Sequence, residues 1–230
     1  MVEVLQATGT QETPEQLERL CREFVTYLTG KQTIYQMIRL AEEVQRRGGQ
    51  PEDPVVYKHR YLERLHQRIA DRREGLRTGR LRPVEMLVPG SLELLEALQA
   101  LGVQMYLASG TDLPCVLEEA QLLGLDRYFG QHIYGALDNY TAFSKAMVIQ
   151  QILKENQVPG DRLLGFGDGY VEILNVKSVG GTAVAVASDE AGRSGKPDPW
   201  KRSRLIGAGA DLVIPDYRDW KPLLDYLWGK

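Results

Sequence analysis

The stretch Leu163-Leu164-Gly165-Phe166-Gly167-Asp168-Gly169 indicates an α/β protein, because it has the pattern of a short apolar strand that ends in a polar turn. A helical pattern over 170–179 follows, and then a second apolar strand over 182–187. A strand, a helix and a strand in this order are typical of parallel strands joined by a crossover helix. We therefore predict an α/β core whose parallel sheet is covered on both faces.

The same alternation extends in both directions from this stretch. We expect further strands over 103–108, 132–134 and 212–214, and helices over 91–100, 113–123, 143–156 and 220–227. Before residue 85 the pattern is helical throughout, with helices expected over 1–7, 13–28, 33–47 and 53–77. Apolar residues recur there every three or four positions, as on a helix with one buried face. We predict a helical unit over 1–84 and an α/β core over 85–230.

Composition limits the classes of protein that the chain can belong to. Its 230 residues carry 28 basic and 31 acidic side chains, a net charge of −3, and 43% are hydrophobic. This balance argues against a general nucleic-acid binder, and no apolar run is long enough to cross a membrane. The two cysteines, Cys21 and Cys115, are too few for a disulfide framework. We expect a cytoplasmic protein with reduced thiols; the sequence indicates no oligomeric state.

Three polar clusters follow or face the predicted strand ends, where open α/β sheets bind ligands. Ser109 and Gly110 offer a hydroxyl and free N–H groups to an anion such as phosphate, or form an ordinary turn. Asp168 and Glu172 are oxygen donors of the kind that Mg²⁺ prefers, or a turn residue and a solvated helix residue. Lys145 could neutralise phosphate charge, although a lone lysine is usually a surface charge.

In their order and spacing, these clusters resemble the haloacid dehalogenase superfamily of phosphohydrolases. Residues 86–216 are similar to the core of that family. Its second motif is matched by 105–110 (Met-Tyr-Leu-Ala-Ser-Gly), its third by 144–146 (Ser-Lys-Ala) and its fourth by 167–172 (Gly-Asp-Gly-Tyr-Val-Glu). The resemblance implies a Rossmann-like parallel sheet, and the helical part at 1–84 resembles the family's inserted helical cap.

The resemblance also implies roles for these residues. Ser109 and the Gly110 N–H would hold the transferring phosphoryl group, and Lys145 would balance its charge. Asp168 and Glu172 would bind Mg²⁺, and the substrate would be a small phosphorylated metabolite. The loop Gly30-Lys31-Gln32-Thr33 could face the cleft, so that Lys31 and Thr33 are candidates for choosing the substrate; alternatively the loop only caps a helix.

The chain departs from the family at its first motif, an Asp-x-Asp-Gly-Thr run whose first aspartate is the nucleophile. No Asp-x-Asp occurs before residue 90. Either Gln6-Ala7-Thr8-Gly9-Thr10 is a degenerate form of that motif, or the strand that carries it lies upstream of Met1, which we favour. We expect the chain as written not to hydrolyse phosphoesters through an aspartyl intermediate.

Without that strand, the resemblance predicts two open edges that face each other in the middle of the sheet, unless another segment fills the gap. Two other functions stay open. The chain could be a regulatory module that binds phosphate without turning it over. Carbon–halogen hydrolysis on the same fold is less favoured, because the paired Mg²⁺ ligands point to phosphoryl chemistry.

Overall fold

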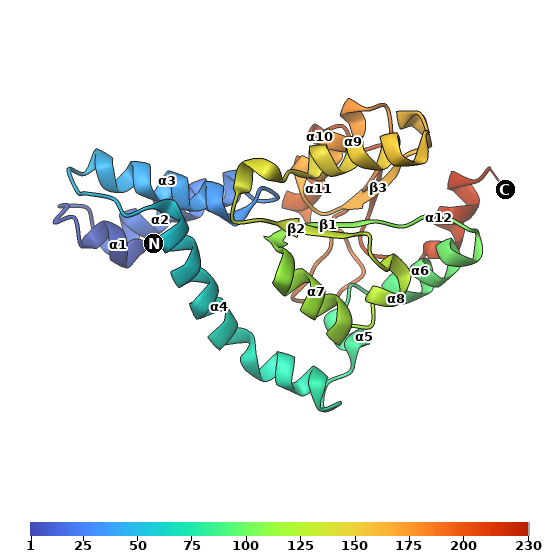
Figure 1. Cartoon of the computed structure of the whole chain (residues 1–230), viewed down its shortest axis with the longest axis horizontal. Coiled ribbons are helices and arrows are strands. Elements are labelled where there is room, and N and C mark those ends of the chain that lie inside the picture. Colours follow the sequence, from blue (N-terminus) through green and yellow to red (C-terminus); the bar gives the residue numbers. More distant parts are fainter. Residues whose placement is uncertain (230) are drawn as a thin grey trace.

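The computed structural model describes residues 1–229 and contains a helical unit and an α/β part (Figure 1). The helical unit consists of α1 (Val2–Gln6), α2 (Pro14–Tyr27), α3 (Thr33–Arg46) and the long α4 (Pro54–Arg77). Figure 1 shows α1–α3 gathered at one end of the molecule, with α4 running from them toward the α/β part. Here we call α1–α4 the cap.

Local sequence signals explain where the cap helices begin. Thr13 forms a capping box with Gln16, and Pro14 occupies the first turn of α2. The Asp53 side chain accepts a hydrogen bond from the N–H of Val55 at the start of α4. The apolar faces of these helices then meet in one hydrophobic core, formed by Leu5, Leu17, Cys21, Phe24, Ile34, Met37, Leu40, Val44 and Tyr57.

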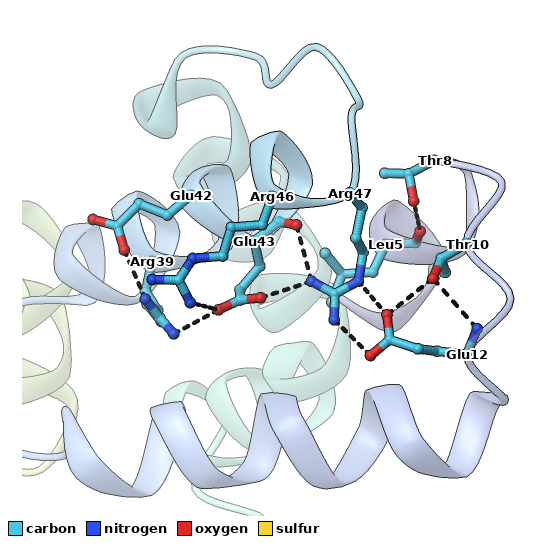
Figure 2. Close-up of polar contacts among 9 residues, drawn as sticks. All are labelled: Leu5, Thr8, Thr10, Glu12, Arg39, Glu42, Glu43, Arg46 and Arg47. Atoms are coloured by element: carbon cyan, nitrogen blue, oxygen red, sulfur yellow. Dashed lines mark hydrogen bonds and ion pairs between the residues drawn. The ribbon is translucent and has the colours of Figure 1, made fainter.

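An ion-pair network joins α3 to the segment before α2 (Figure 2). The carboxylate of Glu43, of which only 4% is exposed, contacts Arg39, Arg46 and Arg47. Arg47 in turn binds Glu12, so that the segment before α2 is held on α3. The cap therefore has both a closed apolar core and satisfied charges.

The α/β part begins with α5 (Pro83–Met86) and α6 (Ser91–Ala100) and contains five strands. Its remaining elements are β1 (Leu107–Asp112), α7 (Leu113–Leu122), α8 (Asp126–Phe129), β2 (Ile133–Ala136), η1 (Tyr140–Ala142), α9 (Lys145–Asn156), η2 (Gly160–Arg162), β3 (Leu164–Gly167), α10 (Tyr170–Ser178), β4 (Thr182–Val186), α11 (Pro199–Gly207), β5 (Leu212–Ile214) and α12 (Trp220–Leu227). Every strand pairing is parallel. The predicted α/β fold with parallel strands and covering helices is confirmed.

The five strands form two separate sheets, β1–β2 and β3–β4–β5. In the first sheet Leu107 is opposite Ile133, and in the second Phe166 is opposite Val184. Within residues 1–229, no strand pairs with the second edge of β1 or of β3. We call the space between these two edges the seam.

Side chains hold the two sheets next to each other across the seam. On one face, α9 reaches both, because Val148 and Ile152 pack in the cluster of β1–β2 while Ile149 packs against that of β3–β4–β5. On the other face, Phe166 of β3 packs against the cluster that contains Ile133 of β2, and its ring lies 5.9 Å from that of Tyr217. The sheets thus share a core although no backbone pairing joins them.

Burial differs among the five strands. All residues of β1 and of β3, which flank the seam, are only partly buried, and so are all residues of β5 at the outer edge of its sheet. In contrast, three of the four residues of β2 and four of the five in β4 are buried. β4 is the central strand of its sheet, so its burial is expected, whereas β2 is better buried than the partner strand β1 that borders the seam.

Some expectations from the sequence were wrong. Strand pairing begins at Leu107 and extends to Asp112, rather than covering 103–108, because β1 pairs only with the register that β2 offers. Helix α11 was not predicted. The segment 6–10 forms the end of α1 and a turn in the cap, where Thr10 Oγ donates to Glu12, so it is not a degenerate strand beside Ser109.

The boundary between 84 and 85 falls inside α5, and stays a prediction. Among the described helices, none combines the length and apolar character needed to span a membrane.

Candidate active site

Lys145 is the first residue of α9 and the centre of the candidate site. The N-cap Ser144 accepts a hydrogen bond from the N–H of Met147 and so fixes the start of the helix. The Lys145 ammonium contacts the Glu172 carboxylate, and only 13% and 17% of these side chains are exposed. Burial lowers the pKa of Lys145 to about 8, against the opposing effect of the Asp168 carboxylate. Chain segments far apart in the sequence therefore converge here.

Asp168 and Glu172 lie where β3 ends and α10 begins. The glycines on either side of Asp168 let Glu172 fold back against the turn, since a Cβ added at Gly169 would lie 2.2 Å from Glu172 Oε2. That oxygen is buried and has no hydrogen-bond partner among the described residues. Asp168 is 60% exposed, and its Oδ2 lies 3.6 Å from Lys201 Nζ. Each of the two carboxylates thus has a lysine beside it, Lys145 next to Glu172 and Lys201 next to Asp168.

Ser109 and Gly110 lie within β1, and a loop of the cap covers them. Ser109 Oγ accepts a hydrogen bond from the N–H of Thr111 at 3.1 Å. A Cβ added at Gly110 would lie 3.1 Å from the carbonyl oxygen of Lys31, so the absence of a side chain permits this close approach. The loop Leu28–Gln32 between α2 and α3, here the cap loop, therefore rests directly on this end of β1.

The cap loop also reaches the carboxylates and so links the two sides of the seam. A Cβ added at Gly30 would lie 3.3 Å from Glu172 Oε2 and 3.4 Å from Val171. The Lys31 side chain, in contrast, is exposed and its Nζ lies 6.0 Å from the centre of the Tyr35 ring. Lys31 thus presents its backbone to the site, while Thr33 is the first residue of α3.

The residues present suit a divalent cation in their chemistry. Asp168 and Glu172 supply carboxylate oxygens, and the buried, unpartnered Oε2 of Glu172 is the kind of atom that a cation satisfies. Within residues 1–229, no cluster of three or more His, Cys, Asp or Glu side chains could enclose a metal ion. Mg²⁺, which keeps several waters and needs few protein carboxylates, fits this pair better than a metal that requires a full protein cage.

Sequence analysis missed three contacts around the site. Lys201, beside Asp168, comes from α11, whose start at Asp198-Pro199 carries a usable capping signal. Gln32 is 94% buried, and its Nε2 donates to the carbonyl of Phe143 at 2.7 Å, just before Lys145. Lys58 of α4 is 3% exposed and lies 2.8 Å from Asp112 at the end of β1, a pairing that no local pattern indicates.

Comparisons with known proteins bear on the fold and the family. The chain resembles a β-phosphoglucomutase from Clostridium difficile (TM-score 0.65, 14% identity, 99% of this chain and 85% of that one). It also resembles a predicted phosphoglycolate phosphatase from Haemophilus somnus (TM-score 0.59, 15% identity, 96% and 87%). A hydrolase from Deinococcus radiodurans with bound phosphate and sodium is similar as well (TM-score 0.56, 18% identity, 97% and 85%).

At these identities the structural likeness establishes the fold alone. A comparison with curated proteins found no match. The model of the haloacid dehalogenase-like hydrolases, however, matches residues 22–180, which is more than half of the chain. That match includes most of the cap, β1, Lys145 and the turn at Asp168. The chain therefore belongs to the haloacid dehalogenase-like hydrolase family.

Proposed function

We propose that this chain forms the cap and the phosphate-binding part of a Mg²⁺-dependent phosphohydrolase that acts on a small phosphorylated metabolite. The observation that carries the proposal is the buried Lys145, whose ammonium contacts the Glu172 carboxylate that the cap loop approaches through Gly30. A buried ammonium beside a carboxylate provides charge that is already in position, which is what phosphoryl transfer requires.

In this proposal each residue has a separate task. Ser109 Oγ and the Gly110 N–H bind phosphoryl oxygens, and Lys145 Nζ neutralises their charge. Asp168 and Glu172 would hold Mg²⁺, which when bound supplies further positive charge to the transferring group. The cap loop excludes bulk water and leaves room only for small substrates. Lys31 and Thr33 act on substrate choice through the position of the loop backbone, since Gly110 contacts the Lys31 carbonyl.

The nucleophile completes the site from the seam. We infer that an extended strand that ends in Asp-x-Asp lies between β1 and β3, parallel to both. Its first carboxylate would attack phosphorus and break the bond to the leaving oxygen, which takes a proton from the second carboxylic acid. Water would then hydrolyse the aspartyl phosphate. The second edges of β1 and β3, which have no backbone pairing within residues 1–229, support an occupant of this kind.

A regulatory module that only binds phosphate is the second candidate. The observation that favours it is the lack of backbone pairing between the two sheets within the described residues. In that case Ser109, Gly110 and Lys145 would hold a phosphate group, and Asp168 and Glu172 would hold its Mg²⁺, but no carboxylate would approach the phosphate from the seam. The two candidates thus predict the same binding and different chemistry.

The first experiment tests binding with the chain alone. Isothermal titration calorimetry with inorganic phosphate in the presence of Mg²⁺ should show binding that weakens about tenfold or more in Ser109→Ala and Lys145→Ala. Lys154→Ala is the matched control, because Lys154 lies exposed in the last turn of the same helix. Equal affinities in all variants, or no binding, would contradict both candidates.

The second experiment separates the two candidates. A synthetic apolar strand that ends in Asp-x-Asp-Gly-Thr is added to the chain, and hydrolysis of p-nitrophenyl phosphate is followed. The proposal predicts Mg²⁺-dependent turnover that is lost when the first aspartate of the peptide is replaced by Asn or when Asp168 is. Binding of the peptide without turnover would favour the regulatory module.

A further inference from the structure

The cap loop is fastened to the α/β part at both of its ends. At the last position of the loop, the buried Gln32 donates from Nε2 to the carbonyls of Tyr140 and Phe143, at 3.2 and 2.7 Å. Before the loop, Arg204 of α11 donates to the last carbonyls of α2, those of Thr26 at 2.6 Å and of Tyr27 at 3.1 Å. The position of the loop over Ser109 and Glu172 thus depends on these two contacts.

The C-terminal end of α2 has an electrostatic need that Arg204 meets. The last turn of α2 contains no basic residue of its own. Carbonyl groups at the end of a helix are left without helical partners and carry partial negative charge, so a cation is favourable there. A charged side chain from another part of the molecule, Arg204, supplies that cation and bridges two carbonyls with its planar fork.

Two aromatic rings hold the Arg204 guanidinium in position. Its central carbon lies 4.4 Å from the ring centre of Tyr170 and 5.1 Å from that of Trp200. Tyr170 is the first residue of α10, directly after the turn that carries Asp168. The stack therefore connects the end of α2 to the helix that presents Glu172.

The hydrogen bonds of Arg204 to Thr26 and Tyr27 lie beside solvent and can therefore be broken easily. Arg204 lines a cleft of about 790 Å³ between α2 and α11, which Tyr27 and Trp200 border with 71% and 51% of their surfaces exposed. Water can replace hydrogen bonds at such a site at little cost. On the other side of the cap, Lys58 is almost fully buried against Asp112, so that attachment is the more permanent one.

We propose that Arg204 is a positioning residue that latches the cap loop over the candidate site, and that the loop opens when Arg204 lets go of Thr26 and Tyr27. The loop then moves away from Glu172 and Gly110 while its last residue stays attached, because the hydrogen bonds of Gln32 to Tyr140 and Phe143 remain. This inference concerns the geometry of closure and does not depend on whether the site hydrolyses phosphate.

Hydrogen–deuterium exchange on the full chain tests the latch. In Arg204→Ala, peptides that cover 26–32 should exchange about tenfold faster, and those that cover 109–111 about threefold faster, because the loop no longer shields them. Exchange in α3 should not change, since its core contacts are untouched. Arg202→Ala, which removes an exposed arginine of the same helix, is the matched control and should match the unmodified chain.

Two further variants keep the test decisive if Arg204→Ala lowers overall stability. Arg204→Lys keeps the charge but not the fork, and Tyr170→Leu removes one ring of the stack; both should give intermediate exchange confined to the loop and 109–111. Unchanged loop exchange in all three variants would overturn the latch. Faster exchange over 26–28 with no change over 109–111 would also overturn it, because Arg204 would then only cap α2.

Discussion

The cap and the seam of this molecule differ in how fully their apolar side chains are buried and their polar groups are paired. In the cap, the helices enclose a core in which Leu5 and Leu17 are fully buried, and a buried Glu43 is surrounded by three arginines (Figure 2). At the seam, β1 and β3 are only partly buried, and among residues 1–229 neither has a pairing partner on its second edge. The candidate site thus lies beside the strand edges whose backbone groups have no pairing partner among the described residues.

This contrast has a physical consequence for how a ligand or partner segment acts. A unit whose apolar groups and charges are already satisfied gains little from a new contact. A sheet edge with open N–H and C=O groups gains backbone hydrogen bonds and apolar burial from any strand that fits. Binding at the seam should therefore change stability much more than binding at the cap.

The largest expected effect comes from a matched pair of leucines. Leu17→Ala in the cap core should lower the free energy of unfolding by about 3 kcal/mol, because it leaves a cavity in a fully buried cluster. Leu107→Ala in β1 should cost only about 1 kcal/mol, because Leu107 is partly buried beside the seam. Urea unfolding followed by circular dichroism measures both.

The strand peptide described above sharpens this pair. When it occupies the seam, the cost of Leu107→Ala should rise toward that of Leu17→Ala, while the cost of Leu17→Ala stays the same. If the two substitutions lower the free energy of unfolding equally in the chain alone, the seam is already filled. The proposed difference between the cap and the seam would then be wrong.

The ion-pair network of the cap gives the next effect. Glu43→Gln should lower the free energy of unfolding by about 2 kcal/mol, because Arg47, with 11% of its side chain exposed, loses a buried carboxylate. Glu42→Gln is the control: Glu42 pairs with Arg39 but is 51% exposed, so its loss should cost less than about 0.5 kcal/mol. Thermal unfolding of the two variants measures both losses in the free energy of unfolding. Similar losses would show that the buried network stabilises the cap no more than a surface ion pair does.

Most elements could be predicted because their signals are local. The helix α3 follows from the period of its apolar residues, and β4 from a run of apolar and β-branched residues. The start of β1 could not be predicted, because it depends on the pairing with a neighbouring strand, which in the described part of the chain is β2. Helix α11 was overlooked although Asp198 accepts a hydrogen bond from the N–H of Lys201, as its Asp-Pro start suggests.

The candidate site could be predicted only as far as the sheet brings its residues together. Lys145 and Glu172 are in contact because parallel strands end at one edge, which the spacing of the motifs already indicates. The approach of Lys31 to Gly110 depends on how the cap docks, and that is set by Arg204 and by Lys58 with Asp112, which are far from it in sequence. Long-range polar pairs of this kind leave no periodic trace.

The smallest effect is a pH dependence in the sheet away from the seam. Asp211, just before β5, accepts hydrogen bonds from Lys177 Nζ at 2.8 and 2.9 Å and from the N–H of Ala183 at 2.7 Å. Burial acts to raise the pKa of Asp211, but the Ala183 N–H and the Lys177 ammonium together hold it below its usual 3.8. A carboxyl whose pKa is lower in the folded state adds stability above its unfolded value, and this is lost as the pH falls through the folded value.

Asp211→Asn should therefore lower the free energy of unfolding at neutral pH by less than about 1 kcal/mol, since the side chain is 39% exposed and water screens the pair. The difference from the unmodified chain should shrink once the pH falls below 3.8, the usual value for the carboxyl. Urea titrations at neutral and acidic pH measure it. A difference that persists in acid would assign the loss to packing at β4–β5, and would mean that the core is incomplete beyond the seam as well.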